Sequence, residues 1–152
     1  MRTKTESFFS LFALSCIVLL FSSCNPEALS VHDVEGEYEG KVEAELGGAP
    51  LGTIGVAQTV VTSPDNLKLR VAFEDLKVAA YDLGSFVVDC GVQYVEREGR
   101  FDLYGEPQVV FEKYGKVPVS VSGEANGGMI DLKLDISAPL NMKLEYTGFR
   151  KK

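Results

Sequence analysis

The sequence contains few of the residues on which enzymes and metalloproteins depend. It has no tryptophan, one histidine (His32) and three cysteines among its 152 residues. Zinc sites use clusters of histidine and cysteine, and a Ser/His/Asp or Cys/His device requires a histidine beside its nucleophile. A single histidine ahead of the first predicted strand supplies neither, so we predict no enzyme, no metal and no other cofactor. A carboxylate pair for glycoside hydrolysis stays open, because the sequence singles out no pair.

The chain also lacks an apolar run long enough to cross a bilayer as a helix. Its main apolar run, Phe8–Phe21, is interrupted by two serines and a cysteine and falls short of the about 20 residues that a membrane helix needs. Arg2 and Lys4 precede the run, and small residues follow it. This order is typical of a secretory signal peptide. We therefore predict a signal peptide over residues 1–23.

The end of this segment indicates a lipid anchor. Leu20-Phe21-Ser22-Ser23-Cys24 resembles the bacterial lipobox, in which a lipid is attached to the cysteine before cleavage in front of it. The rival Ala13-Leu14-Ser15-Cys16 leaves too short an apolar run, whereas a plain signal peptide with an incidental Cys24 stays an alternative. Several acyl chains on one residue anchor a protein durably. Asn25 stands where many inner-membrane lipoproteins have an Asp, which favours the outer membrane. No acidic stretch follows Cys24, which favours the periplasmic face over the cell surface.

Loss of the signal peptide and acylation of Cys24 leave Cys90 as the one thiol of the mature chain. No intramolecular disulfide is then available, so the fold has to depend on its apolar core. A lone cysteine in an exported protein is either reactive or a small buried apolar residue. Cys90 falls on the apolar side of a predicted strand, which favours burial.

Residues 24–152 comprise 129 residues, enough for one domain with a core. They carry 13 Lys and Arg against 21 Asp and Glu, a formal net charge of −8. Nucleic-acid binding requires a basic surface, so we predict no nucleic-acid partner. The basic end, residues 150–152, is the exception to this acidity.

Apolar and polar residues alternate over most of the mature chain. In the stretch Glu37–Leu46 one set contains Tyr38 and Val42, and the other set consists of four glutamates and Lys41. A period of two predicts a half-buried strand. The stretch Leu76–Gly84 is less regular, and we expect its Ala79-Ala80 to belong to a bent connection. Seven further stretches predict strands: Gly52–Thr62, Leu67–Phe73, Phe86–Tyr94, Phe101–Phe111, Val117–Val121, Ile130–Ile136 and Leu140–Tyr146.

The eight predicted strands are joined by short turns, and no segment beyond the signal peptide has helical spacing. We expect Gly105 and Pro107 to bulge or interrupt the long stretch Phe101–Phe111. An open sheet of eight strands would leave two exposed edges and an uncovered apolar face, both of which closure removes. We therefore predict a single all-β domain, an eight-stranded antiparallel up-and-down barrel.

The segment Gly36-Glu37-Tyr38-Glu39-Gly40 resembles the Gly-x-Tyr-x-Gly opening of the calycin-like β-barrel lipoproteins of Bacteroides and related Bacteroidetes. Later strands and the closing Thr147-Gly148 fit the same family, so the resemblance covers most of residues 33–149. It implies a lipocalin-like barrel over residues 36–149, behind a lipidated tether over residues 24–35. The chain departs from true lipocalins in having no Gly-x-Trp motif, so a lipocalin's ligand chemistry is not carried over.

Two functions follow for a lipid-anchored cell-envelope barrel. An eight-stranded barrel either is filled by side chains or holds one small ligand, so the first function is binding of a small apolar ligand inside it. The second is a non-enzymatic interaction or inhibitor module for an envelope protein, using the barrel rim or the acidic face Glu37, Glu39, Glu43 and Glu45. The expected barrel-interior contacts are Tyr38, Val42, Leu69, Val71, Phe73, Phe86, Val88, Leu103, Phe111, Leu132, Leu134, Met142 and Leu144.

Overall fold

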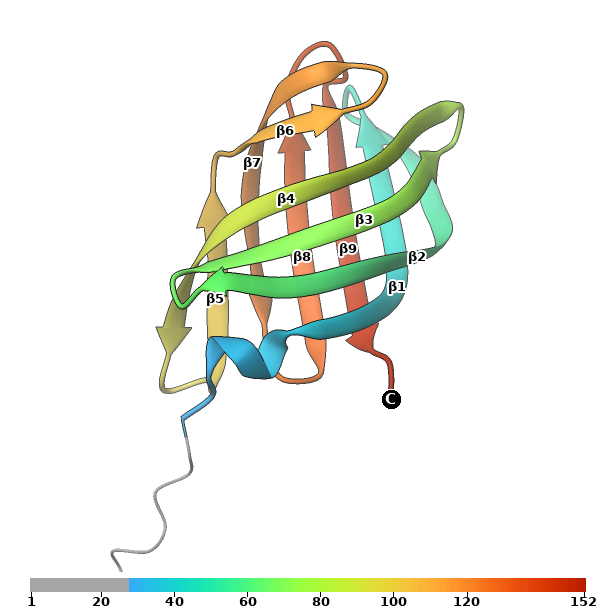
Figure 1. Cartoon of the computed structure of the whole chain (residues 1–152). Coiled ribbons are helices and arrows are strands. Elements are labelled where there is room, and N and C mark those ends of the chain that lie inside the picture. The colour runs from blue at the N-terminus through green and yellow to red at the C-terminus, as the bar shows by residue number, and fades with distance from the viewer. Residues whose placement is uncertain (1–27) are drawn as a thin grey trace, which may run out of the picture.

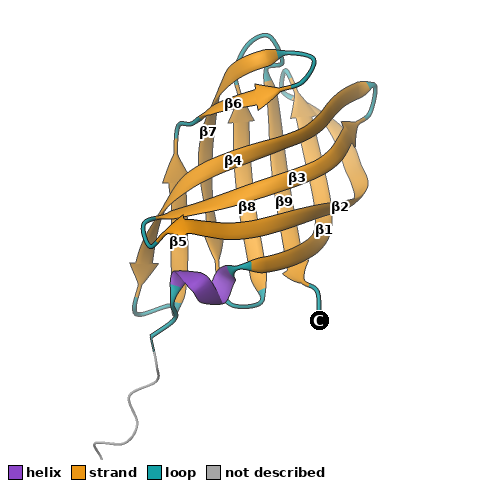
Figure 2. Cartoon of the chain, viewed as in Figure 1, coloured by secondary structure: helices purple, strands orange, loops and turns teal. Residues whose placement is uncertain are grey.

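The computed structural model describes residues 28–152, so the predicted signal peptide and Cys24 lie outside the described residues. This part of the chain is all-β apart from one short 3-10 helix, η1 (Figures 1 and 2). The elements are η1 Val31–Val34, β1 Gly36–Leu46, β2 Ala49–Asp65, β3 Lys68–Val78, β4 Tyr81–Val95, β5 Arg100–Gly105, β6 Gln108–Phe111, β7 Gly115–Ala125, β8 Met129–Ile136 and β9 Met142–Arg150.

Eight of the strands form a closed antiparallel ring. The sheet runs β5-β4-β3-β2-β1-β9-β8-β7, and a further pairing of β5 with β7 joins its two ends. Neighbours in the ring are neighbours in the chain, with two exceptions. The first and last strands, β1 and β9, pair with each other, and β6 lies between β5 and β7 in sequence but pairs with β7 alone. The predicted all-β antiparallel fold and the ring of eight strands are confirmed, with β6 as an additional ninth strand.

The predicted strand Phe101–Phe111 is interrupted where Pro107 and Gly105 suggested. Its two halves, β5 and β6, pair with β7 in one continuous register, from Phe101 opposite Ala125 to Phe111 opposite Gly115. Gly105 has a φ of 146°, a conformation that favours glycine, and Pro107 has no N–H for a ladder bond. At this point β6 separates from β4, whose pairing with β5 ends at Gly91 opposite Tyr104.

The less regular stretch Leu76–Gly84 contains the end of β3, the turn at Ala79-Ala80 where a bent connection was expected, and the start of β4. Odd-numbered residues of β3 face the core up to Phe73, and even-numbered ones do so from Leu76 onward. A bulge at Asp75, with a φ of 44°, shifts the phase by one residue. A search for strict period two fails across such a bulge. The other expected boundaries are close, although Leu140 lies in the turn before β9 rather than on the strand.

Inward-facing side chains form one continuous core, and the thirteen residues predicted to face the barrel interior are all buried within it. At one point the backbones of β1 and β9 approach too closely for any side chain. A Cβ placed on Gly40 would lie 1.9 Å from the carbonyl oxygen of Thr147. Gly40 is therefore required by the close contact between these strands, opposite Gly148.

Candidate functional site

The middle of the barrel interior is filled by aromatic side chains. The rings of Phe73 and Phe86 stack with centroids 4.9 Å apart, and Tyr146 meets Phe73 edge-on at 5.3 Å. Phe111 continues the contact, 4.8 Å from Phe86. The Tyr146 hydroxyl hydrogen-bonds the buried Thr59 hydroxyl at 2.9 Å, and burial raises the pKa of Tyr146. We call Phe73, Phe86, Phe111 and Tyr146 the aromatic cluster.

Cys90 faces this interior, as its strand pattern predicted. Its side chain is buried, and the Sγ atom donates to the carbonyl oxygen of Leu69 at 3.6 Å. Burial raises the pKa of Cys90 to about 12. Because the thiolate is the reactive form of cysteine, Cys90 is a core residue rather than a nucleophile.

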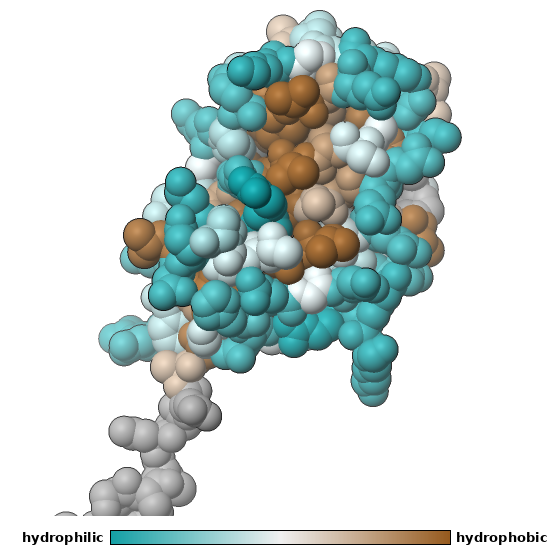
Figure 3. Space-filling model, in the orientation of Figure 1, coloured by the Kyte–Doolittle hydropathy of each residue, from teal (hydrophilic) through white to brown (hydrophobic). Residues whose placement is uncertain are grey.

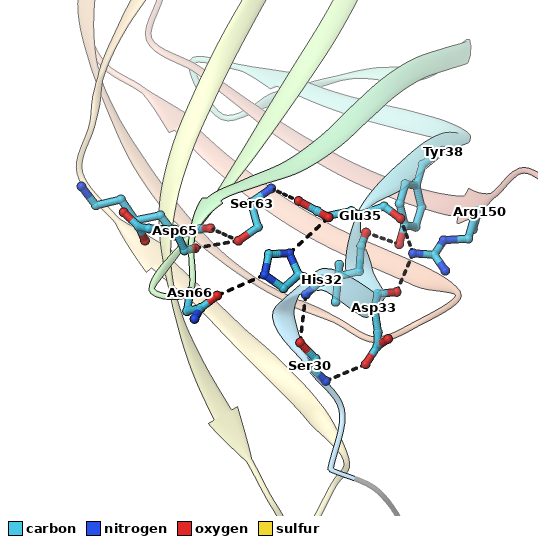
Figure 4. A network of polar contacts seen from close by, with 11 residues as sticks. Ser30, His32, Asp33, Glu35, Tyr38, Ser63, Asp65, Asn66 and Arg150 are labelled. Atoms are coloured by element: carbon cyan, nitrogen blue, oxygen red, sulfur yellow. Dashed lines mark hydrogen bonds and ion pairs between the residues drawn. The ribbon is translucent and has the colours of Figure 1, made fainter.

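One end of the barrel is covered by η1, whose Val31 and Val34 are buried against it. Ser30 and Asp33 form a capping box, in which each side chain accepts a backbone N–H at the start of the helix. Ser30 N–H donates to the Asp33 carboxylate at 2.7 Å (Figure 4). The cap stabilises η1, and its two buried valines pack it on the barrel, so residues 31–34 of the expected tether, 24–35, belong to the folded domain.

Two side chains from the barrel hold η1 by its backbone carbonyl groups. The Arg150 guanidinium, at the end of β9, donates to the carbonyl oxygens of Asp33 and Glu35. The buried Tyr38 hydroxyl donates to the carbonyl oxygen of Val34 at 2.8 Å. Arg150 also lies 5.8 Å from the centroid of the Tyr38 ring, within cation–π range. Figure 4 shows these contacts converging from η1, β1 and β9.

His32 links η1 to the β2–β3 turn rather than to a nucleophile. One ring nitrogen lies 3.3 Å from Glu35 and the other 3.1 Å from the side-chain oxygen of Asn66. The Glu35 carboxylate accepts the backbone N–H of Ser63 at 2.6 Å, and this bond lowers the pKa of Glu35. Among residues 28–152, no group of three or more His, Cys, Asp or Glu side chains has an arrangement suited to a metal ion.

The acidic face predicted on β1 is partly neutralised in the folded chain. Glu45 lies opposite Lys143 of β9, and Glu39 lies 3.8 Å from the Lys151 ammonium. Glu43 instead lies opposite Glu145, which is itself 3.5 Å from Lys133. The face is therefore a mixed surface of both charges.

The barrel wall is open between β4 and β6. Residues Tyr81–Cys90 of β4 pair with β3 but with no other strand in the described part of the chain, and β6 pairs with β7 alone. Side chains cross this gap: Phe86 meets Phe111 inside, and Lys113 forms an ion pair with Asp82 at 2.7 Å outside. The hydrogen bond from Lys113 lowers the pKa of Asp82. We call this region the β4–β6 opening.

An apolar strip crosses the outer wall beside this opening. Val60 of β2 lies opposite Ala72 of β3, which lies opposite Val87 of β4, and all three face outward. Val87 is 44% exposed, and Val110, across the opening on β6, is 56% exposed. Figure 3 shows hydrophobic residues gathered over these strands. We call Val60, Ala72, Val87 and Val110 the apolar strip.

Sequence reasoning missed the apolar strip because each of its residues alone is an ordinary outward valine or alanine. Its members come from strands far apart in the chain, and only the register places three of them in one row. The strip is bordered by a two-point ion pair in which Arg70 donates to both Asp89 oxygens, at 2.7 and 3.0 Å. This pair lowers the pKa of Asp89.

No family model and no curated protein sequence matches the chain. Several solved structures share its fold, including the following two. A Bacteroides fragilis protein assigned to the outer membrane aligns with a TM-score of 0.60 and 16% identity over 78% of this chain. The alignment covers 51% of that protein, so the chain spans about half of its length. A redesigned β-barrel aligns with a TM-score of 0.54 and 12% identity, over 84% of this chain and 100% of the other.

The likeness is one of fold. At these identities it supports a β-barrel resembling that of an outer-membrane protein from Bacteroides, and no ligand or activity. Within residues 28–152, no helix has the length and apolar content that crossing a membrane requires.

Proposed function

We propose that this chain is a lipid-anchored, non-enzymatic protein of the cell envelope that binds a protein partner on the outer wall of a calycin-like barrel. The observation that carries the proposal is the β4–β6 opening with the apolar strip beside it. An unpaired strand edge presents free backbone N–H and C=O groups. Apolar side chains next to such an edge add contact area for a bound segment.

The partner segment that suits this surface is an extended strand with apolar residues at every second position. Such a strand would lie along the outer wall beside β4, and its apolar side chains would pack on Val87 and Val110. The Arg70–Asp89 ion pair at the border would favour a partner segment with a polar group at that position. We favour this surface over the acidic face of β1 as the partner site, because neighbouring cations partly neutralise the acidic face.

A small apolar ligand inside the barrel is less favoured by the geometry. The aromatic cluster occupies the middle of the interior, with ring centroids 4.8–5.3 Å apart. A ligand there would have to separate these rings. Tight packing of this kind is typical of barrels filled by side chains.

The envelope location and the anchor on Cys24 rest on the signal sequence and are compatible with the outer-membrane assignment of the Bacteroides structure. Cys24→Ala, or globomycin treatment, is expected to move the protein out of the membrane fraction or leave its precursor unprocessed. Unchanged membrane fractionation would overturn the anchor.

The partner surface is tested by crosslinking in intact cells, followed by mass spectrometry. A defined partner should be recovered with the wild type and with the control variant Val56→Glu, which makes the same substitution at an exposed valine of β2 outside the apolar strip. It should be lost with Val87→Glu. Equal recovery with both variants would overturn the site, and a bound small molecule in native mass spectra of the wild type would favour the interior ligand instead.

A further inference from the structure

The position of the predicted anchor relative to the barrel is closely limited by chain length. Three residues separate Cys24 from Ala28, the first described residue. An extended chain spans at most about 3.6 Å per residue, so the Cα atoms of Cys24 and Ala28 lie no more than about 14 Å apart. Ala28 is two residues from Ser30, which caps η1. A lipid on Cys24 therefore enters the bilayer close to the η1 end of the barrel.

The η1 end is firmly attached to the barrel, so it does not act as additional tether. Val34 is fully buried, and the Arg150 guanidinium and Tyr38 hydroxyl bind the carbonyl groups of η1. His32 ties η1 to Asn66 in the β2–β3 turn at 3.1 Å. Figure 1 shows the chain entering at this end, with the turns between β4 and β5 and between β7 and β8 on the same side.

Among the large apolar residues whose side chains are described, Leu67 is the most exposed, at 74%, and it lies next to Asn66 in this β2–β3 turn. The turn holds it in place, because the Leu67 N–H donates to the Asp65 carboxylate at 2.9 Å and its carbonyl accepts from Val92 N–H at 3.2 Å. A large apolar side chain fixed outward near a lipid attachment point suits the boundary between headgroups and acyl chains.

We propose that the η1 end of the barrel rests on the lipid bilayer and that Leu67 inserts into the interface. The inference depends on the proposed anchor at Cys24 and adds the orientation of the barrel. The turn carries both charges, since Asp65 precedes Leu67 and Lys68 follows it. The contact therefore does not require anionic lipids, and the β4–β6 opening stays accessible to partners away from the membrane.

The test places a fluorescent probe on the lipidated full-length protein in phosphatidylcholine vesicles that contain brominated lipids. Leu67→Cys is labelled with an environment-sensitive dye, and Val110→Cys on β6 is the matched control. The acylated Cys24 and the buried Cys90 thiol, with its pKa of about 12, do not compete for the dye. Thermal melts of both variants before labelling establish that they fold.

We expect the dye at position 67 to show blue-shifted emission and several-fold stronger quenching by bromolipid than the dye at position 110. The quenching at position 67 should be the same in neutral vesicles and in vesicles that contain anionic lipid. Water-like emission at position 67 in vesicle-bound protein would overturn the orientation and leave the anchor intact. Equal quenching at both positions would overturn it too, because the barrel would then lie on its side. Failure of the wild type to acquire lipid would overturn the anchor itself.

Discussion

The η1 end and the β4–β6 opening are both places where the strands themselves leave the barrel incomplete, but they are closed by different means. At the η1 end, the side chains of Arg150 and Tyr38 donate hydrogen bonds to backbone carbonyl groups of η1 and its C-cap. At the β4–β6 opening, contacts run between side chains, Phe86 with Phe111 and Asp82 with Lys113. The first arrangement satisfies backbone groups, whereas the second leaves the edge of β4 without ladder hydrogen bonds from Tyr81 to Cys90.

The aromatic contact under the opening should carry the largest energetic effect. Phe86→Ala removes a buried ring that touches both Phe73 and Phe111, and Phe→Ala changes in cores cost about 3–5 kcal/mol of unfolding free energy. Urea unfolding of the variant measures this loss. Val87→Ala, one residue away but facing outward, is the control and should change stability by less than about 0.5 kcal/mol. Similar values for the two variants would contradict the role of the aromatic cluster.

At the η1 end, Arg150→Ala should cost less but act locally. It removes one guanidinium nitrogen that two backbone carbonyls share, so we expect a loss of about 1.5–3 kcal/mol in total, the range for a hydrogen bond to a charged group. Amide hydrogen exchange should accelerate in residues 31–35 while the strands of the ring stay protected. Lys151→Ala, which removes only a surface pair with Glu39, is the control. Uniform acceleration through the barrel would show that η1 is not a separate closing element.

Acid should loosen the η1 end before it opens the ring. The pKa of Glu35 is lowered from 4.5, mainly by the Ser63 N–H bond, with His32 beside it. A lowered pKa in the folded state contributes stability above the ordinary pKa, and that stability is lost as pH falls through the lowered value. The protection factors of Ser63 and η1, which correct for the intrinsic pH dependence of exchange, should therefore fall below about pH 4. Glu35→Gln should remove this pH dependence, and a persistent dependence would assign it to another group.

The ion pair across the β4–β6 opening should have the smallest effect. Both Asp82 and Lys113 are partly exposed, and exposed pairs contribute little because water and salt screen them. Lys113→Met should leave the urea midpoint unchanged within error at physiological salt. A clear loss of stability that disappears at high salt would show instead that the ion pair helps to close the wall.

Much of the fold was predictable because most strands keep strict period two. Residues Glu37–Leu46 and Ile130–Ile136 were assigned to strands at nearly the observed bounds, and the thirteen interior residues are buried. The turn at Ala79-Ala80 was expected, but the strands on either side of it within Leu76–Gly84 were not, because the bulge at Asp75 shifts the phase by one residue. The alternation of apolar and polar residues does not reveal such a shift, because the bulge is defined by pairing: two residues of β3 lie opposite one residue of β4.

The candidate sites were less predictable than the strands. His32 was expected ahead of the barrel, but its contact with Asn66 joins residues 34 apart, and Arg150 reaches Asp33 across 117 residues. The apolar strip likewise depends on the register of three strands. Such contacts follow from how strands pair and not from local spacing, so the sequence carried no direct signal for them.

The sequence by itself determined that this chain has an all-β fold with a self-sufficient apolar core, because alternation and the supply of cysteines are local properties. It also carries the signal pattern that predicts the anchor at Cys24. Only the tertiary structure decided that the interior is filled by the aromatic cluster, that η1 covers one end, and that the wall opens between β4 and β6. These features depend on distances between side chains and edges brought together by closure of the ring, which no single stretch of sequence specifies.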